Sequence, residues 1–210
     1  MMKNNRKTEK NRGLLVVLSG PSGVGKNSMI RALIDDDPSL FHSISVTTRE
    51  PRKGEIDGVA YHFVSKDKFR ALIGAGDMLE YDLYCDEYYG TLQSLITEKT
   101  DKGIDVLLDL TIKGALELKK NDPNAVLIFL MPPSLDALRE RLLDRGTESR
   151  ERIEQRLKTA EREMGCIDSF DYLVINDAVE DAVEDIKAIM RAEKRLVTRS
   201  FVDESEADRV

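Results

Sequence analysis

The sequence has no apolar run that could cross a membrane: the longest, Ala125–Met131, has seven residues, whereas a spanning helix needs about 20. It has only two cysteines, Cys85 and Cys166, which cannot form a disulfide framework or a zinc site. The first twelve residues are basic and polar, without the apolar stretch of a secretory signal. We therefore expect a cytoplasmic protein without a membrane partner.

Positive charge is not in excess either. Lysine and arginine number 32 against 39 aspartate and glutamate residues, a net charge of −7, which argues against a nucleic-acid partner. Internal repeats and low-complexity segments are absent. What is present is a chain of 210 residues with a 41% hydrophobic fraction, enough to build the core of one globular domain. The class that remains is a small soluble enzyme, and its oligomeric state is left open.

Strand-like and helix-like segments alternate along the chain. Four continuous apolar runs are typical of strands buried on both faces, namely Gly13–Ser19, Asp105–Leu110, Ala125–Met131 and Asp171–Asn176. Helical patterns lie between or after them, at Ser28–Asp36, Lys113–Lys120 and Val179–Leu196. Parallel strands need crossover connections, which are usually helices. The alternation therefore predicts an α/β fold, a parallel sheet with helices on both faces.

Two stretches interrupt this alternation. Ser43–Leu92 contains short alternating runs and predicts a small mixed-sheet insert between the first and second core strands. Pro132–Glu163 is almost wholly helical and dense in charge, which fits either a mobile helical lid or a solvated amphipathic hairpin. The expected division is a flexible basic tail at 1–12, core segments at 13–42, 93–131 and 164–200, the insert at 43–92, the lid at 132–163 and a tail at 201–210.

A glycine-rich segment between the first strand and the first helix carries the clearest chemical signal. Residues 20–26 read G-P-S-G-V-G-K, and a strand–loop–helix context is what a nucleotide-phosphate loop requires. Glycines at 20, 23 and 25 allow the backbone to approach phosphate closely. The dipole of the following helix and the cation of Lys26 add positive charge. The loop therefore predicts a nucleoside triphosphate site.

The residue after this lysine bears on the metal. A hydroxyl side chain directly after the lysine usually binds Mg²⁺ in loops of this kind, but Asn27 stands there and the hydroxyl comes one residue later, in Ser28. Either Ser28 takes over as a ligand, or phosphates and water hold the ion, as is common for Mg²⁺. We expect Mg²⁺ dependence in both cases.

The insert contains residues suited to a second, smaller phosphate ligand. Arg49 and Arg52 lie three residues apart around a proline and can converge on one dianion. Tyrosines follow in the same insert, and their hydroxyls suit phosphate oxygens. Glu80 can accept hydrogen bonds from the N1–H and 2-amino group of guanine, whereas the N1 of adenine is an acceptor that a carboxylate repels. The insert therefore favours a guanine nucleotide.

Together these separated motifs resemble the guanylate kinases, over about Leu14–Lys194. The resemblance implies phosphoryl transfer from ATP to GMP (and dGMP), with Mg²⁺ as cofactor and 43–92 as the GMP-binding insert. The implied ATP-binding residues are Gly20, Pro21, Ser22, Gly23, Val24, Gly25, Lys26, Asn27, Ser28 and, beside the adenine, Asn176. The implied GMP-binding residues are Ser45, Arg49, Arg52, Tyr61, Glu80, Tyr89, Thr91 and Asp109. The implied catalytic residues are Lys26, Arg49 and, in the lid, Arg145 and Arg156.

Structural roles stay open as alternatives for several of these residues. They are sheet packing for Tyr61 and Tyr89, ion pairing with Glu50 and Glu55 for Arg49 and Arg52, a turn for Thr91 and a strand-end cap for Asn176.

The chain also departs from the family pattern after Asp109, where a second acid is replaced by Thr111 and a glutamine by Lys113. A lost carboxylate near the phosphates weakens the positioning of metal or guanine, while Lys113 adds a cation. Two other functions therefore remain open. One is a kinase of ribose 1,5-bisphosphate similar to the guanylate kinases, and the other is a non-catalytic guanylate-kinase-like module that binds proteins.

Overall fold

The computed structural model describes residues 12–52, 54–84, 86–144 and 149–199. Within these ranges its larger sheet has five parallel strands in the order β2-β7-β1-β8-β9. They are β1 (Leu15–Ser19), β2 (Phe41–His42), β7 (Val106–Asp109), β8 (Val126–Met131) and β9 (Tyr172–Ile175). The central strand β1 is buried along its whole length, as expected for an apolar strand covered on both faces.

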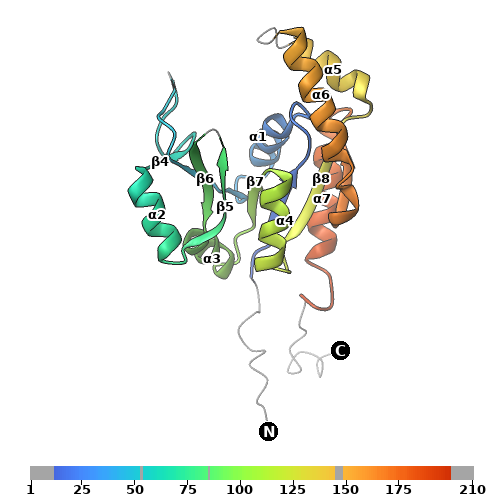
Figure 1. Ribbon diagram of the computed structural model, residues 1–210. Coiled ribbons are helices and arrows are strands. Elements are labelled where there is room, and N and C mark those ends of the chain that lie inside the picture. Colours follow the sequence, from blue (N-terminus) through green and yellow to red (C-terminus); the bar gives the residue numbers. More distant parts are fainter. Residues whose placement is uncertain (1–11, 53, 85, 145–148, 200–210) are drawn as a thin grey trace, which may run out of the picture.

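Helices cover both faces of this sheet (Figure 1). Helices α1 (Lys26–Asp36) and α7 (Val179–Glu193) pack on one face, where they share a core with Val16 and Leu18 of β1. Helices α3 (Gln93–Asp101) and α4 (Ile112–Asn121) cover the other face, together with Leu15 and Val17. Successive β1 side chains thus enter two cores, because side chains alternate along a strand. The predicted α/β class is confirmed.

The carboxyl ends of the parallel strands meet at one edge, where open α/β sheets bind ligands. The register places Leu18 of β1 opposite Asp109 of β7, and Ser19 opposite Phe129 of β8. The glycine-rich loop leaves β1 at this edge, and Asn176 follows the end of β9 there. The fold therefore brings the loop, Asp109 and Asn176 together from distant parts of the sequence.

A second, mixed sheet is formed within residues 43–92, the segment we call the insert. Its strand order is β4-β3-β6-β5, with β3 parallel to β4 and antiparallel to β6, and β5 antiparallel to β6. The elements are β3 (Val46–Thr47), β4 (His62–Phe63), α2 (Lys66–Gly74), β5 (Met78–Tyr84) and β6 (Glu87–Leu92). Ser65 caps α2 by accepting a hydrogen bond from the Lys68 N–H, and Phe69 of α2 is fully buried.

Two helices form a separate pair beyond β8. Helices α5 (Leu135–Asp144) and α6 (Arg150–Met164) share a small core of their own, which consists of Leu138, Leu142, Ile153, Leu157 and Ala160. The pair and the insert lie on opposite sides of the larger sheet in Figure 1. The short 3₁₀ helix η2 (Ile167–Ser169) connects the pair to β9.

The structure differs from the sequence predictions mainly at short elements and helix ends. Helix α1 begins at Lys26 rather than at Ser28, and α7 ends at Glu193 rather than at Leu196. Strand β2 was not predicted, because two residues cannot show a periodic pattern. Among the helices that the structure describes, none combines the length and apolar character needed to span a bilayer.

Candidate active site

The glycine-rich loop leads into the N-terminus of α1 at the carboxyl edge of the sheet. Gly25 is the N-cap of α1 with φ 103°, it supplies no capping side chain, and the first turn of α1 has no acidic residue. The first N–H groups of a helix have no partner within the helix and attract anions. A Cβ atom at position 25 would lie 2.6 Å from Nδ2 of Asn176. Only glycine therefore fits both the backbone and the space.

Lys26 lies between the loop and Asp109. Its Nζ donates a hydrogen bond of 3.1 Å to the Gly20 carbonyl and lies 3.9 Å from Oδ1 of Asp109. Burial raises the pKa of Asp109, while the charge of Lys26 lowers it. The predicted metal ligand Ser28 and its neighbour Asn27 are exposed on the first turn of α1. The half-buried site thus combines the cation of Lys26, the carboxylate of Asp109 and the N-terminus of α1.

Asn176 supports the loop from β9. Its side chain is buried, and Nδ2 donates a hydrogen bond of 2.7 Å to the Val24 carbonyl. Its own N–H donates to the Met131 carbonyl at 2.8 Å. Its Oδ1 is buried and has no hydrogen-bond partner among the described residues. The residue predicted to lie beside adenine thus fixes the backbone of the phosphate loop.

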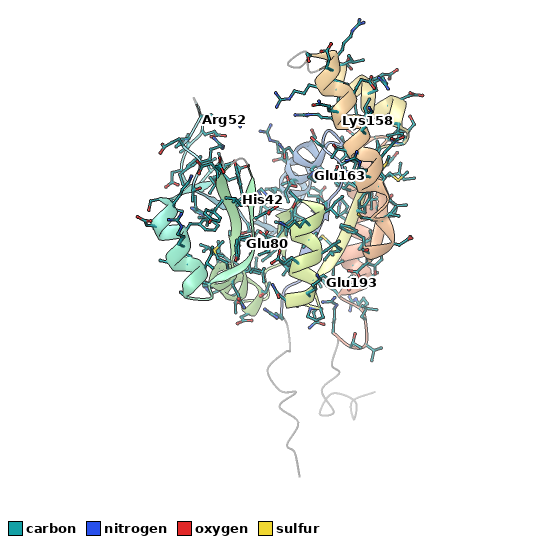
Figure 2. The ribbon with its side chains drawn as sticks, viewed as in Figure 1. His42, Arg52, Glu80, Lys158, Glu163 and Glu193 are labelled. Atoms are coloured by element: carbon teal, nitrogen blue, oxygen red, sulfur yellow. The ribbon has the colours of Figure 1, made fainter. Side chains whose placement is uncertain are left out.

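Two charged residues of the α5–α6 pair also reach this region, and neither was predicted from the sequence. Arg141 of α5 donates hydrogen bonds to the carbonyls of Asn176 (2.8 Å) and Asp177 (3.1 Å). Glu163 lies in the last turn of α6, labelled in Figure 2. Burial raises the pKa of Glu163, while the charge of Lys26 and the backbone N–H of Ser22 lower it. Within a charge-dense helical segment, neither residue stood out from the solvent-facing ones.

An arginine–tyrosine cluster forms in the insert. Arg49 Nη2 pairs with Oε1 of Glu55 at 2.8 Å, which raises the pKa of Arg49. The guanidinium carbon lies 5.4 Å from the centre of the Tyr61 ring, within cation–π range. The Tyr61 and Tyr89 rings meet edge to face at 5.9 Å. Burial raises the pKa of Tyr61, and Tyr89 and Asp109 raise it further, so Asp109 acts electrostatically on this cluster.

Arg52 stands apart from this cluster. The residue is exposed at the tip of the insert (Figure 2). Its backbone N–H donates to Oε2 of Glu55 at 2.7 Å, so Glu55 holds both the Arg49 side chain and the Arg52 backbone. The ion pair between Arg49 and Glu55, one of the alternatives left open by the sequence, is therefore present, and a bound anion would have to compete with it.

Three predicted residues lie side by side across the insert sheet. Thr91 Oγ1 donates a hydrogen bond of 2.8 Å to Oε1 of Glu80, and the two residues are 1% and 6% exposed. Val46 of β3 pairs with Gly90 of the antiparallel strand β6. One residue further along this register, the half-buried Ser45 lies opposite Thr91. Burial, above all, raises the pKa of Glu80 to about 7. A buried carboxylate with one hydroxyl partner is a strong hydrogen-bond acceptor that remains incompletely satisfied.

The remaining predicted residues are placed as follows. Arg156 lies half-buried in α6, and Arg145 falls outside the described residues. Thr111, which replaces a family acid, is the N-cap of α4 and accepts a hydrogen bond of 3.1 Å from the Gly114 N–H. In the part of the chain that the structure describes, no three His, Cys, Asp or Glu residues gather as a metal site.

Comparisons with known proteins agree with this geometry. A family model described as guanylate kinase matches residues 12–193. A guanylate kinase of Oceanobacillus iheyensis is 46% identical over 184 residues, covering 88% of this chain and 89% of that protein. One of Streptococcus pneumoniae R6 is 47% identical over 189 residues, covering 90% and 91%. The crystal structure of guanylate kinase from Anaplasma phagocytophilum matches with a TM-score of 0.71 and 32% identity, over 90% of each chain. The chain belongs to the guanylate kinase family.

Proposed function

We propose that this protein transfers the terminal phosphoryl group of ATP to GMP, giving ADP and GDP. The observation that carries the proposal is the buried Glu80–Thr91 pair in the insert. A carboxylate there accepts hydrogen bonds from the N1–H and 2-amino group of guanine and disfavours adenine. The pair belongs to the same insert as the cluster of Arg49, Tyr61 and Tyr89, which is suited to a phosphate ligand.

On the donor side, the loop at 20–28 holds the ATP phosphates. The N–H groups at the start of α1 and Lys26 supply positive charge to the phosphates as the bond to the leaving ADP breaks. Asn176 keeps the Val24 carbonyl, and hence the loop, in its binding conformation. The attacking GMP phosphate is already an anion, so the reaction needs no general base.

On the acceptor side, Arg49 and Arg52 hold the GMP phosphate, assisted by the hydroxyls of Tyr61 and Tyr89. GMP releases Arg49 from Glu55 when it binds, because a phosphate dianion offers a stronger partner than one carboxylate. Ser45, Thr91 and Glu80 line the base, and Asp109 stands between the two sites. A bidentate guanidinium grip orients the acceptor phosphate for in-line attack.

The donor set suits a Mg²⁺ ion that arrives with ATP. The described residues include no cluster of three metal-binding side chains, whereas the half-buried Asp109 lies 3.9 Å from Lys26 and the exposed Ser28 lies in the first turn of α1. Mg²⁺ commonly keeps phosphate and water ligands, and these two residues would hold it in place. When bound, the ion neutralises charge on the β- and γ-phosphates.

The α5–α6 pair acts as a lid over the donor site in this proposal. Residues 132–163 would close and bring Arg145 and Arg156 to the transferring group. Closure also excludes water, which would otherwise accept the phosphoryl group. Residues 43–92 act as the second moving part, on the opposite side of the larger sheet.

A substrate panel tests the proposal. ADP release from ATP and Mg²⁺ would be measured with GMP, dGMP, AMP, UMP, CMP and ribose 1,5-bisphosphate as acceptors. We expect turnover confined to GMP and dGMP. Turnover with ribose 1,5-bisphosphate alone would make the protein a sugar-phosphate kinase, and ATP binding without turnover on any acceptor would overturn the kinase assignment.

A further inference from the structure

Helix α4 and strand β5 are joined at both ends, which ties the insert to the core. At the start of α4, Lys113 Nζ pairs with Oδ1 of Asp82 at 2.5 Å. At its end, Asn121 Nδ2 donates a hydrogen bond of 3.0 Å to the Leu79 carbonyl. Between these contacts, a Cβ atom at Gly114 would lie 2.9 Å from Oε2 of Glu80. The carboxylate of Glu80 is therefore packed directly against the first turn of α4.

Two carboxylates act on Glu80 at this junction, and one of them is paired with a lysine (Figure 2 labels Glu80). Asp82 lies two residues along β5, on the same face of the strand, and Glu117 lies one turn beyond Lys113 on α4. Both carboxylates disfavour the ionised form of Glu80, whereas the Thr91 hydroxyl on β6 favours it. Lys113 carries the opposite charge and is paired with Asp82, one of these two carboxylates.

The charge state of Glu80 determines whether it can bind guanine. An ionised carboxylate accepts hydrogen bonds from both the N1–H and the 2-amino group, whereas the protonated form turns one oxygen into a donor that faces these donors. When only a fraction of the protein is binding-competent, the apparent dissociation constant is the intrinsic one divided by that fraction. A change in the ionised fraction of Glu80 therefore changes GMP affinity directly.

We propose that Lys113 is a positioning residue for GMP, which keeps more of Glu80 ionised by pairing with Asp82 across the junction. The inference rests on the proposed function, since it assumes that Glu80 binds guanine. It also gives a role to the lysine that replaces the usual family glutamine. Lys113 acts through Asp82 and Glu80 and does not touch the substrate itself.

The test compares the two partners of the ion pair. GMP dissociation constants would be measured by calorimetry between pH 6 and pH 8.5 for wild type, Lys113→Gln, Asp82→Asn and the double variant. Dividing each value by that of wild type at the same pH removes the ionisation of the GMP phosphate. Lys120→Gln is the matched control, because Lys120 is an exposed lysine on the same helix.

We expect opposite effects that are confined to low pH. At pH 6, Lys113→Gln should weaken GMP binding about two- to threefold and Asp82→Asn should tighten it by a similar factor, the scale of an exposed ion pair. The double variant should stay close to wild type, and all values should converge at pH 8.5, where Glu80 is ionised in every protein. Lys120→Gln should match wild type throughout.

Weaker GMP binding in both single variants at every pH would show that the ion pair only holds the insert against α4, and this would overturn the inference. No change in Lys113→Gln at pH 6 would overturn it as well. If wild type bound no GMP at any pH, the proposed function itself would fail. If wild type bound GMP and Lys113→Gln bound it equally well, only the role of Lys113 would fail.

Discussion

Replacement of Glu80 by glutamine should stabilise the nucleotide-free protein, and the gain should grow with pH. Glutamine has nearly the same shape and can still accept the hydrogen bond from Thr91. It removes the need to ionise a side chain that is only 6% exposed. Isolated ionised carboxylates are unfavourable in such surroundings, so the substitution trades substrate recognition for stability.

The size of the gain follows from the pKa. The fold raises the pKa of Glu80 from its ordinary 4.5 to about 7, and one pH unit corresponds to about 1.4 kcal/mol. The folded protein therefore holds the proton more tightly than the unfolded chain, and wild type loses stability as pH rises from about 4.5 to about 7. Above pH 7 the full loss applies, so Glu80→Gln should gain up to about 3 kcal/mol relative to wild type.

Urea unfolding at pH 5, 6, 7 and 8 without nucleotide would measure this difference. Glu140→Gln, at an exposed position of α5, is the control and should track wild type at each pH. Saturating GMP should stabilise wild type more than Glu80→Gln, because the variant has lost the carboxylate that binds guanine. A stability difference that stayed constant or shrank from pH 5 to pH 8 would refute the reasoning.

Three further substitutions test the remaining parts of the site. Lys26→Ala should lower kcat at least about 100-fold, the scale of one preorganised charge contact; a value within about threefold of wild type would count against the role of Lys26. Asn176→Ala leaves the Val24 carbonyl without its buried donor, so it should lower the free energy of unfolding by about 1–3 kcal/mol and raise the KM for ATP. The control Asn121→Ala should leave the KM for ATP unchanged. Arg49→Ala should raise the KM for GMP and leave the KM for ATP unchanged. Unchanged kinetics for both substrates would show that Arg49 does not bind GMP.

Continuous apolar runs in the sequence made much of the fold predictable. The apolar runs that became β1, β7, β8 and β9 are continuous because both faces of these strands are covered, so no alternation obscured them. Strand β2 and helices α2 and α3 escaped prediction, and β2 did so because two residues have no period. The register of the strands, which places Asp109 next to the phosphate loop, depends on packing across the sheet and is not visible in local sequence.

The candidate site was predictable where spacing carried the chemistry. The phosphate loop has a fixed order of residue types, and Arg49 and Glu80 lie in recognisable segments. Glu163 and Arg141 gave no such signal, because charged residues on an amphipathic helix look alike until the neighbouring elements are in place. Lys113 was recognisable as a departure from the family pattern, but its partner Asp82 lies 31 residues away. Their contact exists only once α4 packs on β5.

The hydrogen bond from Asn176 to the Val24 carbonyl spans 152 residues of the chain, and this span has a consequence for protein synthesis. The loop is made early by the ribosome, yet its supporting amide is made near the end. Contacts of such high sequence separation form late in folding, and chains grow from the N-terminus. A nascent chain therefore carries the phosphate loop for most of its synthesis without the support that shapes it. Nucleotide capture should begin only when the last strand of the sheet is in place.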